Sequence, residues 1–138
     1  MIIFTNGCFD QIHIGHIRLF KYCAGFWTQT NVPRTCGARV IVGLNSDESV
    51  RRLKGNNRPK YKQEHRKEVL ENMWNVHEVI IFEEDTPLEL IKKIKPDIIV
   101  KGGDWKPEDI AGYGIAEIRL FPLVKLEGIK ISSGKEGT

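Results

Sequence analysis

Two histidines near the N-terminus, His13 and His16, have the residue type and the spacing of a phosphate-binding pair. Side chains three positions apart lie on the same face of a helix, and Gly15 between them leaves no side chain to obstruct a ligand. The apolar residues 1–4 predict a buried parallel strand that residues 5–7 end, so a helix is expected to begin near the histidines. Because the start of a helix offers unpaired N–H groups and the positive end of its dipole, this arrangement predicts a polyphosphate site.

Other roles for these side chains stay open. The two histidines could bind a metal together with Cys8, but metal sites usually have three or four ligands, and the sequence offers no fourth at a recognisable spacing. A purely structural role is a further alternative. Asp10 suits two compatible roles, because its carboxylate can cap the helix or hold Mg²⁺ beside a triphosphate.

Strand and helix patterns alternate along the rest of the chain. Further strands are predicted at residues 39–44, 78–82, 97–101 and 117–123. Pro122 places the last of these at a sheet edge. Helices are predicted from the histidines to Gly25 and at residues 48–53, 64–74, 86–95 and 107–111. The alternation predicts an α/β fold, a doubly wound, Rossmann-like, mostly parallel five-stranded sheet with helices on both faces, which binds ligands at the carboxyl ends of its strands.

Local signals also predict how two helices begin. Ser46 or Asp47 is expected to cap the helix at residues 48–53. Residues 86–89 read Thr-Pro-Leu-Glu, a capping box with Pro87 at the first helical position.

Several segments together are similar to a known family. Residues 7–16 read GCFDQIHIGH and resemble the signature of the HxGH nucleotidyltransferase superfamily. The resemblance continues through VGLNSDESVRRLKGNNRP (42–59), EHR (64–66), EDTPLELI (84–91) and KPDIIVKGGDW (95–105). The chain is most similar to the adenylyltransferase domain that acts on D-glycero-β-D-manno-heptose 1-phosphate. The resemblance implies a reaction in which ATP and a sugar 1-phosphate give an ADP-sugar and pyrophosphate, with Mg²⁺.

Two alternatives accompany that resemblance. The otherwise similar glycerol-3-phosphate cytidylyltransferases use CTP, and a loose match near residues 127–129 favours them. A non-catalytic nucleotide-binding module is the alternative of another class. It is motivated by residues 124–138, which are atypical or truncated where the family has a final helix.

The resemblance and the residue patterns give a set of site residues. The predicted catalytic residues are His13, His16, Lys54 and Arg58. The last two fall in the basic segment 54–62, which is expected to be a mobile lid that offsets transition-state charge, or else an ordinary solvated loop. The predicted nucleotide-binding residues are Asn6, Gly7, Cys8, Phe9, Asp10, Gly15, Asn45, Asp47, Lys101, Gly102, Gly103, Asp104, Ser132 and Ser133, and Asp10 is the predicted Mg²⁺ ligand.

Size and composition limit the remaining possibilities. The 138 residues are enough for one domain, expected to span residues 1–138. The net charge of +3 is too small to indicate nucleic-acid binding but suits small phosphorylated substrates. No apolar run is long enough to span a membrane. Three cysteines without a zinc spacing favour a reduced cytoplasmic setting, and the family resemblance with Phe26 and Trp27 favours a homodimer.

Overall fold

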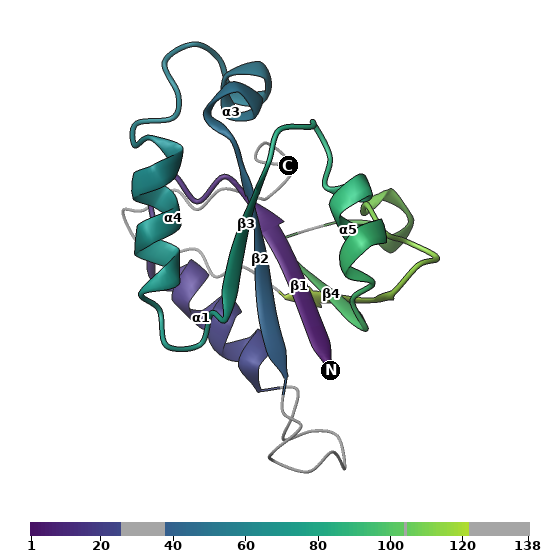
Figure 1. Ribbon diagram of the computed structural model, residues 1–138. Coiled ribbons are helices and arrows are strands. Elements are labelled where there is room, and N and C mark those ends of the chain that lie inside the picture. The colour runs from purple at the N-terminus through teal and green to yellow at the C-terminus, as the bar shows by residue number, and fades with distance from the viewer. Residues whose placement is uncertain (26–37, 104, 122–138) are drawn as a thin grey trace.

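The computed structural model describes residues 1–25, 38–103 and 105–121. The described strands form one parallel sheet in the order β3-β2-β1-β4-β5, with β1 at the centre (Figure 1). The strands are β1 (Ile2–Gly7), β2 (Arg39–Asn45), β3 (Glu78–Phe82), β4 (Ile98–Gly102) and β5 (Glu117–Phe121). The order reverses on either side of β1, which confirms the predicted doubly wound α/β fold.

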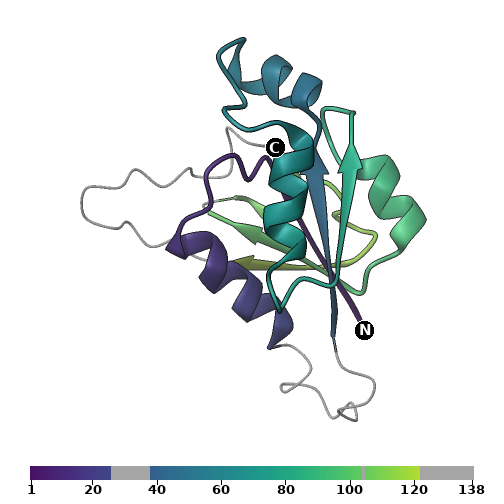
Figure 2. The same ribbon diagram turned by 60° about the vertical axis from the view of Figure 1, so that its left-hand side comes forward.

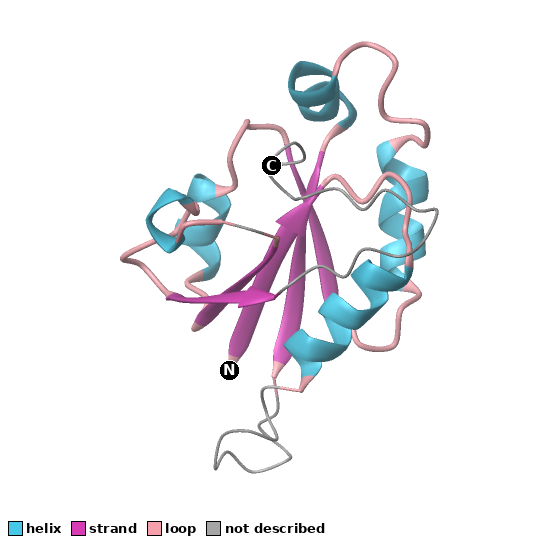
Figure 3. Cartoon of the chain, turned by 180° about the vertical axis from the view of Figure 1, so that it is seen from behind, coloured by secondary structure: helices cyan, strands magenta, loops and turns pink. Residues whose placement is uncertain are grey.

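Helices cover both faces of this sheet. They are α1 (Ile14–Ala24), α3 (Asp47–Lys54), α4 (Gln63–Glu71), α5 (Leu88–Ile94) and the short 3₁₀ helix η2 (Pro107–Asp109). Helices α1 and α4 lie on one face, whereas α5 lies on the other (Figure 2). Helix α3 lies beyond the carboxyl end of β2, as the view from behind also shows (Figure 3). No described helix is long and apolar enough to cross a membrane.

The central strand is buried on both faces. Ile3 and Phe4 are both fully buried, but they belong to different clusters. Ile3 packs in the cluster that includes Phe20 of α1, and Phe4 packs in the cluster that includes Ile91 of α5. Because alternate side chains of a strand point to opposite faces, a strand covered on both sides must be apolar at consecutive positions. This explains the apolar run that identified β1 in the sequence.

Strand β1 is longer than predicted. The sequence prediction ended it at Phe4, yet it continues to Gly7 because Asn6 and Gly7 pair in register with Gly43 and Leu44 of β2. Neighbouring backbone therefore overrides the turn-forming tendency of these residues. Gly43 is required for this fit, since a Cβ atom there would lie 2.7 Å from the Phe4 ring.

Three helix predictions are corrected by the structure. Helix α4 ends at Glu71 and not at residue 74, and residues 107–109 form only a single 3₁₀ turn. Helix α5 begins at Leu88, where Pro87 is the N-cap and makes no side-chain capping bond, so the predicted capping box is wrong. The expected cap of α3 is confirmed, because the Ser46 hydroxyl accepts a bond from the Ser49 N–H. These ends depend on tertiary contacts that a local pattern does not contain.

Candidate active site

The two histidines form the N-terminus of α1. His13 is the N-cap, and its Nδ1 accepts a hydrogen bond of 3.1 Å from the Gly15 N–H. His16 Nδ1 in turn accepts a 3.2 Å bond from the His13 N–H, which completes a capping box made of two imidazoles. The rings stack with their centroids 3.9 Å apart and their planes at 26°. The alternative that Asp10 caps this helix is therefore wrong.

This capping arrangement fixes where the imidazole protons lie. Because both Nδ1 atoms accept hydrogen bonds, each neutral ring carries its proton on Nε2. Burial lowers the pKa of His16 to about 3, helped by repulsion from His13 and Lys54, and burial also lowers the pKa of His13. At neutral pH the pair therefore consists of uncharged rings with Nε2–H groups available to donate to phosphate oxygens.

The turn before the helix holds His16 in place. Phe9 adopts a left-handed backbone conformation with φ of 45°, which is unusual for a residue with a large side chain. Its ring meets the His16 ring edge-on at a centroid distance of 5.2 Å and also contacts Phe20 in α1. A Cβ atom on Gly7 would come within 3.2 Å of the Phe9 ring, so glycine there permits the close packing of this turn.

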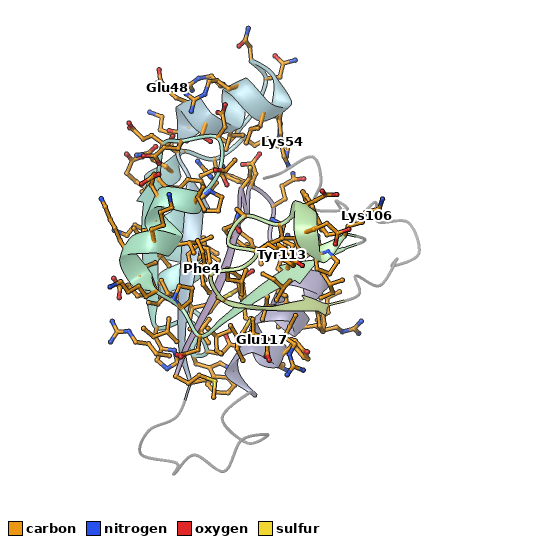
Figure 4. The ribbon with its side chains drawn as sticks, turned by 90° about the vertical axis from the view of Figure 1, so that its right-hand side faces the viewer. Phe4, Glu48, Lys54, Lys106, Tyr113 and Glu117 are labelled. Carbon is orange, nitrogen blue, oxygen red and sulfur yellow. The ribbon has the colours of Figure 1, made fainter. Side chains whose placement is uncertain are left out.

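Asp10 joins this turn to the segment that follows α3. Its buried carboxylate accepts hydrogen bonds from the Lys60 N–H at 2.8 Å, the Tyr61 N–H at 3.0 Å and Arg58 Nε at 2.9 Å. Burial by itself would raise the pKa of Asp10, but these donors outweigh it and lower the pKa below its usual value. These hydrogen bonds hold part of the predicted lid segment, residues 54–62, against the turn that contains Asp10. Lys54 stands at the end of α3 (Figure 4). It lies close enough for its charge to act on His16.

A magnesium site does not form from the described side chains. Both Asp10 carboxylate oxygens accept hydrogen bonds from the protein, so in this conformation Asp10 does not fit the role of a metal ligand. No group of three or more His, Cys, Asp or Glu that could hold a metal exists among the described residues, which also excludes the alternative of a metal bound by His13, His16 and Cys8. Mg²⁺ commonly binds proteins through substrate phosphates and retained waters, and that mode fits the residues present.

A buried arginine that sequence reasoning missed connects the parts of the site. Arg66 in α4 is 2% exposed. Its Nη1 donates to the carbonyl oxygens of Cys8 and Asn45, both at 2.8 Å, and its Nε donates to the Tyr61 carbonyl at 2.9 Å. Its Nη2 pairs with Asp47 Oδ1 at 2.8 Å. One guanidinium thus links the turn after β1, the end of β2, the start of α3 and the segment before α4.

The sequence did contain a signal for this role. Arg66, Leu70 and Met73 have the spacing of one helical face, and Leu70 and Met73 are packed in the core. An arginine on the same helical face as core residues is expected to be buried and to bind hydrogen-bond or ion-pair partners there. Two predicted nucleotide-binding residues take part in the same scaffold, since Asp47 pairs with Arg66 and the Asn45 amide donates to Ser49 Oγ at 2.9 Å. Their roles toward a nucleotide remain predictions.

Other predicted residues lie on the opposite face of the sheet. Asn6 and Lys101 line a small pocket of about 60 Å³ together with Thr86, Trp105, Asp109 and Ile110. Lys101 is 5% exposed, and burial lowers its pKa to about 7, an effect that the nearby Cys8 thiol opposes. Gly102 and Gly103 follow at the end of β4, where Gly103 has a φ of 106°. Asp104, Ser132 and Ser133 lie outside the described residues, as does the Phe26–Trp27 pair.

Comparison with known proteins places this site in a family. The cytidylyltransferase-like family matches residues 4–129. The bifunctional protein HldE of a Nitratiruptor species is 47% identical over 125 residues, which are 90% of this chain and 25% of that protein. The bifunctional protein HldE of Aliarcobacter butzleri is 42% identical over 137 residues, 99% of this chain and 25% of that protein. The chain therefore spans about a quarter of the length of these relatives.

A solved structure shares the fold. The lipopolysaccharide core biosynthesis protein from Thermoplasma volcanium superposes with a TM-score of 0.64 at 22% identity, covering 91% of this chain and 98% of that one. The likeness covers most of both chains and so agrees with the architecture described above. Since the family match spans the sheet, the histidine pair and the buried arginine alike, the chain belongs to the cytidylyltransferase-like family of nucleotidyltransferases, as its HxGH segment predicts.

Proposed function

We propose that this chain transfers AMP from ATP to a sugar 1-phosphate similar to heptose 1-phosphate and releases pyrophosphate. The observation that carries the proposal is the pair of neutral imidazoles at the start of α1, where their Nε2–H groups and the helix dipole act together. The adenylyl and sugar assignments are supported by segments 42–59 and 95–105, which resemble the heptose 1-phosphate subgroup.

The chemistry needs positioning and charge stabilisation more than proton transfer. A phosphate oxygen of the sugar 1-phosphate is already an anionic nucleophile, so no general base is required. It attacks the α-phosphorus while the bond from that phosphorus to the pyrophosphate oxygen breaks. The Nε2–H groups of His13 and His16 donate to the oxygens on which charge accumulates, and Lys54 adds a positive charge nearby. Mg²⁺, held by the triphosphate, would supply further charge neutralisation.

A crossed assay tests the assignment. ATP and CTP are each combined with heptose 1-phosphate and with glycerol 3-phosphate, with and without Mg²⁺, and pyrophosphate release is measured. We expect turnover chiefly with ATP and heptose 1-phosphate in the presence of Mg²⁺. Preference for CTP with glycerol 3-phosphate would identify the cytidylyltransferase alternative. Tight nucleotide binding without pyrophosphate from any pair would identify a non-catalytic module.

Assembly and location are part of the same proposal. A homodimer is supported by the family resemblance alone, because the aromatic pair that suggested an interface lies outside the described residues. A cytoplasmic setting is supported by the cysteines, which have no zinc spacing. Light scattering at micromolar concentration is expected to give twice the chain mass of 15.8 kDa. A mass of one chain would contradict the dimer and leave the proposed reaction unaffected.

A further inference from the structure

The pocket on the α5 face contains buried hydrogen-bond donors without acceptors. The Asn6 side-chain amide nitrogen and the Trp105 indole nitrogen are both buried with no partner among the described residues. Lys101 Nζ lies over the Trp105 ring in a cation–π contact, 5.1 Å from the ring centre, and makes no hydrogen bond or ion pair within the described part of the chain. Buried polar groups are nearly always paired, so several unpaired donors around one pocket indicate a missing acceptor. A group rich in anionic oxygens would satisfy all three.

The pocket and the histidines lie on opposite sides of β1. Asn6 has the same orientation as Phe4, and Lys101 has the same orientation as Ile99, because alternate residues of a strand share a face. Phe4 and Ile99 belong to the core beneath α5, so the pocket is on that face. Helix α1, which carries the histidines, covers the other face. The two sites meet at the carboxyl end of β1, where Cys8 is near enough to Lys101 for their charges to interact.

This placement matches the geometry of an in-line displacement. The attacking and leaving oxygens lie on opposite sides of the phosphorus that is transferred. If the leaving pyrophosphate is held at the N-terminus of α1, the nucleophile must approach from the far side of the α-phosphorus. The pocket on the α5 face provides that approach. Thr86 and Asp109 line the same pocket and offer oxygen atoms to sugar hydroxyls.

We infer that this pocket binds the phosphate of the acceptor, with Asn6, Lys101 and Trp105 as its hydrogen-bond donors. The inference rests on the proposed nucleotidyl transfer and assigns its second substrate. In the reaction, one acceptor phosphate oxygen forms the new bond to the α-phosphorus, and the bridging oxygen leaves with the pyrophosphate. No proton needs to be transferred. The lowered pKa of Lys101 agrees with a buried amine whose positive charge is stabilised only when an anion is present.

Binding can be tested without turnover. The indole N–H signal of Trp105, assigned with the Trp105→Phe variant, is followed by nuclear magnetic resonance in the wild-type chain. Heptose 1-phosphate and inorganic phosphate are each added, and the non-hydrolysable ATP analogue with an α,β-methylene bridge is added separately. We expect both phosphate probes to shift this signal and the analogue alone to leave it nearly unchanged. A shift with the analogue alone would overturn the inference, because the pocket would then hold the nucleotide.

Kinetics provide the second test. Lys101→Met is expected to raise the KM for heptose 1-phosphate about 10- to 100-fold, as loss of a charged hydrogen bond does, while the KM for ATP changes less than about twofold. Trp105→Phe should show a smaller effect of the same kind. Lys106→Met is the matched control, because Lys106 is exposed and extends from the surface (Figure 4). An equal rise in the KM for ATP would overturn the inference and leave nucleotidyl transfer intact, whereas absence of turnover in the wild type would count against the proposed function alone.

Discussion

Each histidine of the pair uses one ring nitrogen to cap its own helix and leaves the other for a ligand. His13 and His16 donate nothing through Nδ1, so their Nε2–H groups are the only ring donors. An uncharged donor fits this task, because its hydrogen bond strengthens as negative charge grows on a phosphate oxygen. Permanently charged rings would be costly to bury when no substrate is bound. Catalytic stabilisation can therefore be larger for the transition state than for the bound triphosphate.

His16→Ala tests the role of the more deeply buried ring. We expect kcat to fall by roughly 10²–10³-fold, as for loss of one donor to developing charge. The measurement is steady-state pyrophosphate release by a variant whose circular dichroism matches the wild type. His77→Ala is the control, since His77 precedes β3 at the opposite end of the sheet. Unchanged turnover in folded His16→Ala would exclude contact with the reacting phosphates.

The protonation state of His16 gives an independent prediction. With a pKa of about 3, its ring stays neutral between pH 8 and pH 5, so its Cε1–H chemical shift should not change over that range. The unfolded chain takes up a proton near pH 6.5 and the folded chain does not, so His16 lowers the free energy of unfolding as the pH falls from about 6.5 toward 3. A titration with a midpoint near 6.5 would contradict the buried, capping geometry.

At the scale of elements, Arg66 determines how the turn after β1, the start of α3 and the segment before α4 meet. Arg66→Met would leave the carbonyl groups of Cys8, Asn45 and Tyr61 without this donor and Asp47 without its cation. We expect a loss of about 3–5 kcal/mol in the free energy of unfolding, measured by denaturant titration.

A matched variant separates the effect of burial from the effect of charge on the free energy of unfolding. Arg52 in α3 pairs with Asp85 at 2.9 Å, but both side chains are largely exposed. Arg52→Met should therefore change the free energy of unfolding by no more than about 1 kcal/mol. Equal losses in the two variants would show that Arg66 contributes only as an ordinary surface charge.

The elements themselves were largely predictable, and their connections were not. Residues 39–44 and 78–82 were found from their apolar runs, because strands covered on both faces must be continuously apolar. The end of β1 and the start of α5 were missed, since pairing with β2 and packing against the sheet decide them. Asp10 is a predicted site residue, but its hydrogen-bond partners Lys60 and Tyr61 lie about fifty positions away, and no local pattern in the sequence reveals the contact.

At the scale of the whole molecule, the acceptor pocket has a cost in stability. An unfolded lysine titrates near 10.5, whereas burial gives folded Lys101 a pKa of about 7. Between these values the unfolded chain binds more protons, so Lys101 makes the free energy of unfolding rise with pH over that window. The neighbouring Cys8 thiol, whose pKa burial raises, acts in the opposite direction at alkaline pH. Asp109 is the acidic side chain that lines the same pocket as Lys101.

Lys101→Met should remove that cost. We expect the midpoint of thermal unfolding at pH 7 to rise by about 3–6 °C, because the variant no longer buries an amine that has no hydrogen-bond acceptor or counterion. The free energy of unfolding should rise less between pH 7 and pH 10 in the variant than in the wild type. Cys8 is present in both proteins, so comparing them removes its contribution. Differential scanning calorimetry at several pH values measures both effects. A lower midpoint at pH 7 would show that the amine is already well paired in the folded chain.

The central position of β1 also divides the chain into the two parts that carry the two proposed substrate sites. The strand order places everything through β3 on one side of β1 and everything from β4 onward on the other. The histidine pair, Asp10 and Arg66 all precede residue 83, whereas the pocket on the α5 face comes from later residues except for Asn6. In the proposed reaction, substitutions in the second part would change which acceptor is used and leave the triphosphate site unchanged. A family built on this sheet could diversify by exchanging its second half, with the connection between β3 and α5 as the natural point of recombination.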